Sequence, residues 1–134
     1  MRTRRNVIDY ALKRRARLAQ VRSGLVAAAE ACDAHPHLLL AARHYGSPAQ
    51  SPCPICQGPK VQLVRFVYGD ELGQSAGQAK SVRELDAMDG AVGAVSVYVV
   101  EVCPDCRWNH LLESFVIGTG DDASGAPAGR SRAR

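Results

Sequence analysis

Two cysteine pairs constrain this chain more than any other feature of its sequence. Cys53-Pro-Ile-Cys56 and Cys103-Pro-Asp-Cys106 are both C-x-x-C motifs, and residues 57–102 separate them. Zinc takes four thiolates in a tetrahedron, and each such turn presents two sulfurs to one side of the ion. We therefore predict one structural zinc ion bound by these four cysteines. Because four protein ligands leave no position for water, the site predicts stabilisation rather than catalysis.

Other uses of the cysteines stay open at this point. C-x-x-C pairs also occur as redox dithiols, in which a thiolate is activated at the start of a helix. Gly58-Pro59 follows the first pair and a β-like run follows the second, so neither pair opens a helix. His110 lies close enough to Cys106 to replace a cysteine as ligand, but a strand position suits it better. The fifth cysteine, Cys32, is interpreted as a small buried apolar side chain.

The chain totals predict a soluble cytoplasmic protein. Its 134 residues suit one domain with a modest core. It has no signal-peptide pattern and no apolar run near the ~20 residues of a membrane span. Its five cysteines then fit a reducing compartment.

The formal charge of +4 is unevenly distributed. Residues 1–22 hold many arginines and lysines against one acid, Asp9, whereas residues 23–117 carry more acids than bases. An acidic body repels phosphates, so any contact with nucleic acid must come from the N-terminal segment.

Residues 1–6 read as a disordered basic lead, and residues 7–46 as a helical segment. Apolar residues, among them Leu12 and Leu18, follow helical spacing from Val7 to Arg22, which predicts an amphipathic helix with these residues on its inner side. Its predicted outer face would meet nucleic acid or an acidic partner and consists of Tyr10, Lys13, Arg14 and Arg17.

Arg15 and Arg22 fall within the predicted apolar stripe of this helix. Their stems can cover the margin of the core while their charged groups meet acids there. We predict that Arg15 or Arg22 pairs with an acid in the body, and the candidates are Asp33, Asp70 and Glu71.

Two more short helices are predicted before residue 46. Gly24 suits the end of the first helix, Val26–Ala31 forms a second, and Pro36 starts a third that runs to about Tyr45. Three successive helices allow a helix-turn-helix, but bundles that brace a sheet are commoner. The histidines of this region are interpreted as caps and surface residues: His35, His37 and His44.

Residues 52–118 are predicted to form a zinc ribbon. Val61–Tyr68, Val95–Val102 and His110–Ile117 are rich in β-branched residues, and each cysteine pair adjoins one of these strands. The fold class is therefore α+β, with the N-terminal helical segment packed on a three-stranded antiparallel zinc-ribbon sheet. Residues 119–134 have the composition of a disordered tail.

An insertion separates the first two strands. Ser81-Val-Arg-Glu84 forms a capping box, which predicts a helix near residues 81–89. Asp70 and Glu71 precede it and suggest acid–base chemistry or a hard metal, but adjacent side chains diverge and no nucleophile accompanies them. Ion pairing is the preferred use.

Three segments resemble a small actinobacterial zinc-ribbon family of unknown function. They are Tyr68-Gly-Asp-Glu-Leu-Gly73, Ala76-Gly-Gln-Ala79 and Cys106-Arg-Trp-Asn-His-Leu111, and the resemblance spans about Asp9 to Gly120. It implies the same four cysteines as the zinc set. It implies no activity.

Two functions fit the sequence. The first is a non-enzymatic module that binds RNA or DNA, or the transcription or translation machinery, through its basic helix. The second is a protein-interaction or scaffold domain with an acidic partner. An enzyme ranks third, because no nucleophile set, phosphate-binding loop or open metal site can be assembled, and no small-molecule substrate is indicated.

Overall fold

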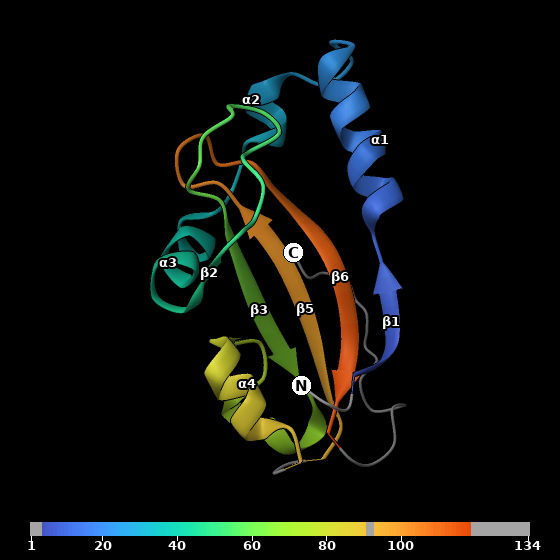
Figure 1. Cartoon of the computed structure of the whole chain (residues 1–134), viewed down its shortest axis with the longest axis vertical. Helices are drawn as coiled ribbons and strands as arrows, with labels where there is room; N and C mark the ends of the chain where they lie inside the picture. Colours follow the sequence, from blue (N-terminus) through green and yellow to red (C-terminus); the bar gives the residue numbers. More distant parts are fainter. Residues whose placement is uncertain (1–3, 91–92, 119–134) are drawn as a thin grey trace.

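The protein mixes helices with one antiparallel sheet, as the sequence predicts (Figure 1). The structure is a computed structural model that describes residues 4–90 and 93–118, without the side chain of Glu71. The predicted tail lies outside these residues, as do the first three residues of the lead. The elements in chain order are β1 (Arg5–Asp9), α1 (Ala11–Arg22), α2 (Ala28–Ala31), α3 (Pro36–Tyr45), β2 (Ser47–Pro48), β3 (Gln62–Tyr68), the 3-10 helix η1 (Asp70–Ser75), β4 (Ala79–Lys80), α4 (Val82–Met88), β5 (Val95–Val102) and β6 (Asn109–Ile117).

The sheet is larger than the sequence predicts. Its order is β1-β6-β5-β3-β2, β4 pairs with β3, and every pairing is antiparallel. The three predicted strands are present as β3, β5 and β6, and β5 has the predicted bounds. Over the described ranges the sheet has six strands, so the predicted number of three is wrong. β2 and β4 have two residues each, too few to leave a pattern in the sequence.

The first strand replaces the start of the predicted N-terminal helix. The helix was expected from Val7, but α1 begins at Ala11, and Arg5–Asp9 forms an edge strand paired with β6. The carboxylate of Asp9 accepts a hydrogen bond from the backbone of Ala11 (2.8 Å), which helps the helix to start there. Pairing with β6 thus outweighs helical periodicity in this segment.

The helices that cover the sheet follow their sequence signals. α3 has the predicted bounds, and Gly24 has φ +86° after α1. The capping box of α4 is present: Ser81 N–H donates to the Glu84 carboxylate (2.8 Å), and Glu84 N–H donates to the Ser81 hydroxyl (3.2 Å).

Both faces of the inner strand β3 are buried. Val64 and Val67 point to opposite faces, because side chains alternate along a strand. Val64 packs in a cluster with Ala42 of α3, and Val67 packs with Leu85 of α4. A third cluster lies at the end of the sheet that carries the cysteine motifs, between α1, α2 and those motifs.

In the described part of the chain, every helix is too short or too polar to cross a membrane.

Candidate metal centre

Antiparallel pairing brings the two cysteine motifs to the same end of the sheet. The first motif precedes β3, and the second connects β5 to β6. Gln62, at the start of β3, pairs with Val102, at the end of β5. The two motifs are therefore neighbours in space, although residues 57–102 separate them in the chain.

Both motifs fold into the same turn. In each, the carbonyl of the first cysteine accepts from the N–H of the residue four positions after it, and the N–H of that cysteine donates to the carbonyl of the residue five positions after it. Gln57 and Arg107 occupy equivalent positions and have left-handed φ values of 65° and 75°. Such values are uncommon outside glycine, so their repetition indicates a geometry that the site imposes. The bonds are Cys53 N to Gly58 O (2.9 Å), Gln57 N to Cys53 O (3.0 Å), Cys103 N to Trp108 O (2.8 Å) and Arg107 N to Cys103 O (2.8 Å).

Backbone N–H groups point at the sulfurs of the first motif. The Sγ of Cys53 accepts from the N–H groups of Ile55 (3.4 Å) and Cys56 (3.5 Å). The Sγ of Cys56 accepts from the N–H of Gly58 (3.4 Å). Hydrogen bonds of this kind stabilise a thiolate, which is the form of cysteine that binds metals.

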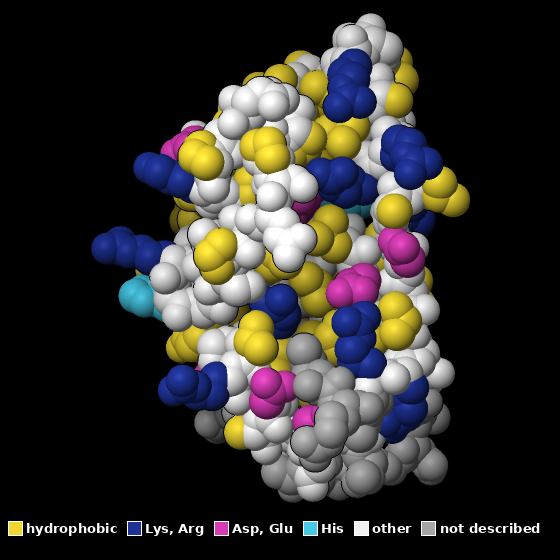
Figure 2. Space-filling model, in the orientation of Figure 1, with side chains coloured by type: hydrophobic (Ala, Val, Ile, Leu, Met, Phe, Trp, Pro, Cys, Tyr) yellow, Lys and Arg dark blue, Asp and Glu magenta, His cyan; other side chains and the backbone are white. Residues whose placement is uncertain are grey.

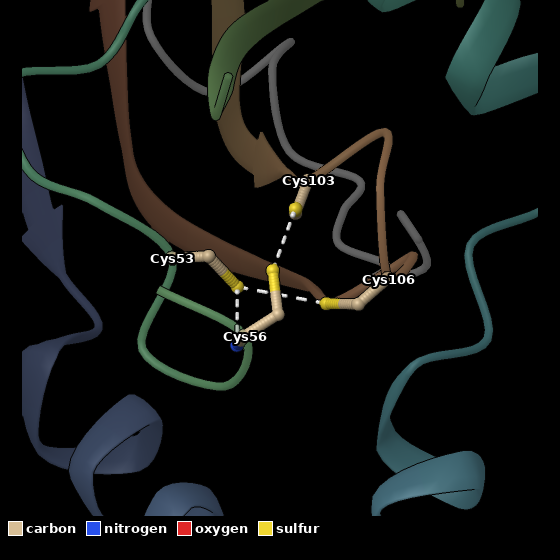
Figure 3. A group of neighbouring side chains, drawn as sticks. All are labelled: Cys53, Cys56, Cys103 and Cys106. Carbon is tan, nitrogen blue, oxygen red and sulfur yellow. Dashed lines mark hydrogen bonds between the residues drawn. The ribbon is translucent and has the colours of Figure 1, made fainter. Parts of the chain in front are cut away.

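The four sulfurs converge on one point, as Figure 3 shows. All four Sγ atoms lie within 4.8 Å of one another. The contacts between Cys53 and Cys106 and between Cys56 and Cys103 are both 3.6 Å. A zinc ion with four Zn–S bonds of about 2.3 Å needs sulfurs about 3.8 Å apart. The donor set therefore fits one tetrahedral metal ion.

The thiols differ in how readily they lose a proton. Burial raises the pKa of Cys53 and Cys103, and it raises the pKa of Cys106 to about 12. Cys56 is exposed, and the N–H of Gly58 lowers its pKa. A metal ion has to displace protons from the three thiols whose pKa is raised, so its affinity for the site increases with pH.

A buried carboxylate that the sequence reading did not identify connects this end of the sheet to α1. Glu101 is 6% exposed, and its Oε2 accepts from the indole of Trp108 (2.7 Å) and from Nε of Arg14 (2.5 Å). Trp108 is fully buried and packs with Cys53 and Cys103. The sequence did contain a signal for this contact, because Glu101 is the one acid in the apolar run of β5. A charge that is buried in such a strand requires a charged or hydrogen-bonding partner.

The predicted outer face of α1 is fully exposed only in part. Lys13 is exposed and lies 5.8 Å from the ring of Tyr10. Arg14 and Arg17 are half-buried, and Arg14 turns into the body to reach Glu101. The predicted orientation of Arg14 is therefore wrong, because a buried acid on a distant strand attracts it.

The predicted inward arginines are also misplaced. Arg15 and Arg22 are exposed, and among the described side chains neither forms an ion pair with Asp33 or Asp70. The side chain of Glu71 lies outside the description. The inward side of the helix carries Leu18 and Val21 instead, and its ion pair comes from Arg14.

The acids and histidines named from the sequence have local roles. Asp33 accepts a hydrogen bond from the amide of Asn109 (3.0 Å), and Asp70 begins η1. His35 caps α3 by accepting from the N–H of His37 (3.0 Å), as predicted. His110 stacks on the Trp108 ring, with the centroids 5.9 Å apart.

The sequence of nearly the whole chain matches the model of one protein family. The model of the family of unknown function DUF5318 matches residues 1–131. The chain belongs to the DUF5318 family. The resemblance to a small actinobacterial family of unknown function is thereby confirmed, and the DUF5318 description names no metal.

Three mycobacterial proteins are similar to this chain. They are the uncharacterized proteins Rv0049 and MT0055 of two Mycobacterium tuberculosis strains and Mb0050 of Mycobacterium bovis. Each is 43% identical over 116 residues, which cover 87% of this chain and 85% of the relative. No solved structure matches the chain significantly.

Proposed function

We propose that the protein is a non-enzymatic binding module held together by one structural zinc ion. The observation that carries the proposal is the convergence of four cysteine Sγ atoms within 4.8 Å. Four soft thiolates in a tetrahedron favour zinc or iron over magnesium or calcium, which prefer oxygen ligands. Four protein ligands complete the coordination of zinc, so the ion stabilises the turns and offers no position to a substrate. Two turns of this kind at the ends of β-strands also support the zinc-ribbon description.

Metal analysis tests the proposal directly. We expect protein purified under reducing conditions to contain one zinc ion per chain, and Cys103→Ser to contain well below one. Replacing zinc by Co²⁺ should give the visible absorption of a four-thiolate complex, which reports the ligand type. Iron in place of zinc, or a metal-free reduced protein, would contradict the zinc assignment.

The surface of α1 favours a protein partner over nucleic acid. Two arginines of the N-terminal segment already interact with the body: Arg14 of α1 pairs with Glu101, and Arg4 before β1 pairs with Glu113 at 2.9 Å. A phosphate would have to compete with these carboxylates for both guanidinium groups. The module therefore has less free positive charge than its sequence suggests.

Exposed apolar side chains accompany the remaining charge. Leu12 on α1 is 74% exposed and Leu25 beyond it is 76% exposed. Ala11–Arg22 contains no acid, and Figure 2 shows basic and hydrophobic side chains together over α1. A protein partner that offers both carboxylates and apolar groups matches this surface. Binding to RNA, DNA or a nucleoprotein would use the positive charge of this surface but not its exposed leucines.

Two double variants separate the partner classes. Tagged full-length protein is cross-linked in its host and purified beside Leu12→Ser/Leu25→Ser and Lys13→Gln/Arg15→Gln. We expect one protein partner to survive nuclease treatment and to be lost from both variants, while their melting temperatures stay within a few degrees of the parent. All four positions are exposed, and substitutions at such positions usually change the free energy of unfolding by less than about 0.5 kcal/mol.

Nucleic-acid binding makes a different prediction for the same variants. Affinity for a labelled RNA or DNA would fall with salt, with a log–log slope of ~0.7 to 0.9 for each phosphate neutralised. Only Lys13→Gln/Arg15→Gln would flatten that slope. Tight binding with this behaviour would favour the nucleic-acid alternative over the protein partner.

A further inference from the structure

The fifth cysteine lies against the four-cysteine site. The Sγ of Cys32 is 3.7 Å from the Sγ of Cys106, and Cys32 is half-buried rather than fully buried as its sequence context suggested. Its sulfur is not one of the four that lie within 4.8 Å of one another. Cys32 therefore has the position of a free thiol that touches one metal ligand.

Contacts on the chain after Cys32 hold this thiol in place. The N–H of Ala34 donates to the carbonyl of Arg107 (3.0 Å), next to Cys106 in the second motif. Asp33 accepts from the side chain of Asn109 (3.0 Å). Ala31 and Ala34, on either side of the thiol, are buried. The contact between the two sulfurs thus belongs to a docked segment.

Cys106 differs from the other three cysteines of the site because it is both partly exposed and in contact with a thiol outside the set. Cys53 and Cys103 are fully buried, whereas Cys106 is partly exposed and accessible to a small oxidant. Cys56 is exposed, but its sulfur contacts the sulfur of Cys103, another member of the set. Cys106 is therefore the cysteine of the set that an oxidant can reach and that also has a neighbouring thiol, Cys32, outside the four metal-binding sulfurs.

We propose that Cys32 and Cys106 form a peroxide-sensitive disulfide that opens the metal site. The inference rests on the proposed zinc site. In the first step the Cys106 thiolate attacks a hydroperoxide: an S–O bond forms, the O–O bond breaks, and hydroxide or alkoxide leaves. In the second step the Cys32 sulfur attacks the sulfenic acid: an S–S bond forms, the S–O bond breaks, and water leaves with the Cys32 proton.

The disulfide has a consequence for the metal. Two thiols lose two electrons in total, and one peroxide is reduced. The zinc ion loses the Cys106 ligand, and three thiolates hold it less tightly than four. Zinc is released, and a dithiol reductant that reduces the disulfide restores the site.

Peroxide treatment of the zinc-loaded full-length protein tests this inference. Zinc release is followed with a chelating dye while hydrogen peroxide is added, and the product is mapped by mass spectrometry without reduction. We expect release of the bound zinc, a Cys32–Cys106 cross-link, and recovery of zinc binding after dithiothreitol. For Cys32→Ser and Cys32→Ala we expect unchanged initial zinc content, release on the order of tenfold slower, and little recovery because Cys106 oxidises further.

The outcomes distinguish the two proposals. A protein without zinc before oxidation would contradict the zinc site, and the mapping would still show whether Cys32 pairs with Cys106. A cross-link between Cys53 and Cys106 or between Cys56 and Cys103, with equal release rates in Cys32→Ser, would overturn the role of Cys32. Zinc retained in the wild-type protein after peroxide treatment would overturn it as well.

Discussion

Removing the zinc ion is expected to unfold the end of the molecule that carries the cysteine motifs. Structural zinc contributes about 10 to 16 kcal/mol of binding free energy in small zinc-dependent folds, and whole domains are stable by only about 5 to 15 kcal/mol. The cluster at this end contains Cys53, Cys103 and Trp108, all fully buried. Without the metal, the four cysteines no longer link the two turns. The free energy of metal binding that stabilised this core is then lost.

The single tryptophan provides the measurement. Trp108 is the one tryptophan of the sequence, and it lies beside the site. Titration with a strong chelator under reducing conditions should shift its fluorescence to the red as the indole meets water. Adding zinc back should reverse the shift.

Matched variants make this prediction specific. Cys53→Ser should give the red-shifted spectrum and a large loss of melting temperature without chelator. Cys32→Ser should behave as the wild-type protein, because Cys32 is outside the set of four sulfurs. Complete loss of metal with unchanged Trp108 fluorescence and melting would show that the metal does not stabilise this region.

Replacing Arg14 by methionine is expected to destabilise the protein far more than the same change at Arg15. Arg14→Met removes the charged partner of the buried Glu101 carboxylate and leaves its hydrogen bond with the Trp108 indole. Breaking a buried ion pair from one side costs about 3 to 5 kcal/mol. The Arg14 side chain is 29% exposed, so water can replace part of the lost contact. We expect about 2 to 3 kcal/mol for Arg14→Met and within about 0.5 kcal/mol for exposed Arg15→Met.

Thermal and urea unfolding of the zinc-loaded variants measure this difference. A loss of 2 to 3 kcal/mol corresponds to a fall in melting temperature of roughly 10 °C for a domain of this size. The double variant Arg14→Met/Glu101→Gln should recover part of the stability, because it removes the unpaired charge. Equal melting temperatures for Arg14→Met and Arg15→Met would mean that the ion pair contributes nothing to docking of α1.

The two predictions describe one structural unit. Glu101 links α1 to Trp108, and Trp108 packs against the cysteines. Loss of zinc should therefore loosen α1 as well as the two turns. If α1 carries the partner surface, the oxidation proposed for Cys32 and Cys106 would weaken partner binding through this connection.

Local sequence signals located the three long strands β3, β5 and β6 and the four cysteines of the candidate metal centre. The C-x-x-C spacing identified four cysteines that the fold brings together, and Val95–Val102 was identified as a strand with its observed bounds. Ser81 and Glu84 formed the expected capping box. Each of these signals consists of residues a few positions apart, so short-range chemistry is sufficient to specify it, whereas the meeting of the two cysteine pairs depends on the pairing of β3 with β5.

Only the tertiary structure decided the orientation of α1, the strand before it and the neighbour of Cys32. Periodicity placed Leu12 inside and Arg14 outside, whereas Leu12 is 74% exposed and Arg14 reaches Glu101. The periodic pattern measures hydrophobicity along the helix, but it contains no information about a buried carboxylate that lies 87 positions away in the chain. Such a carboxylate makes a half-buried arginine favourable, because each charge offsets the desolvation of the other.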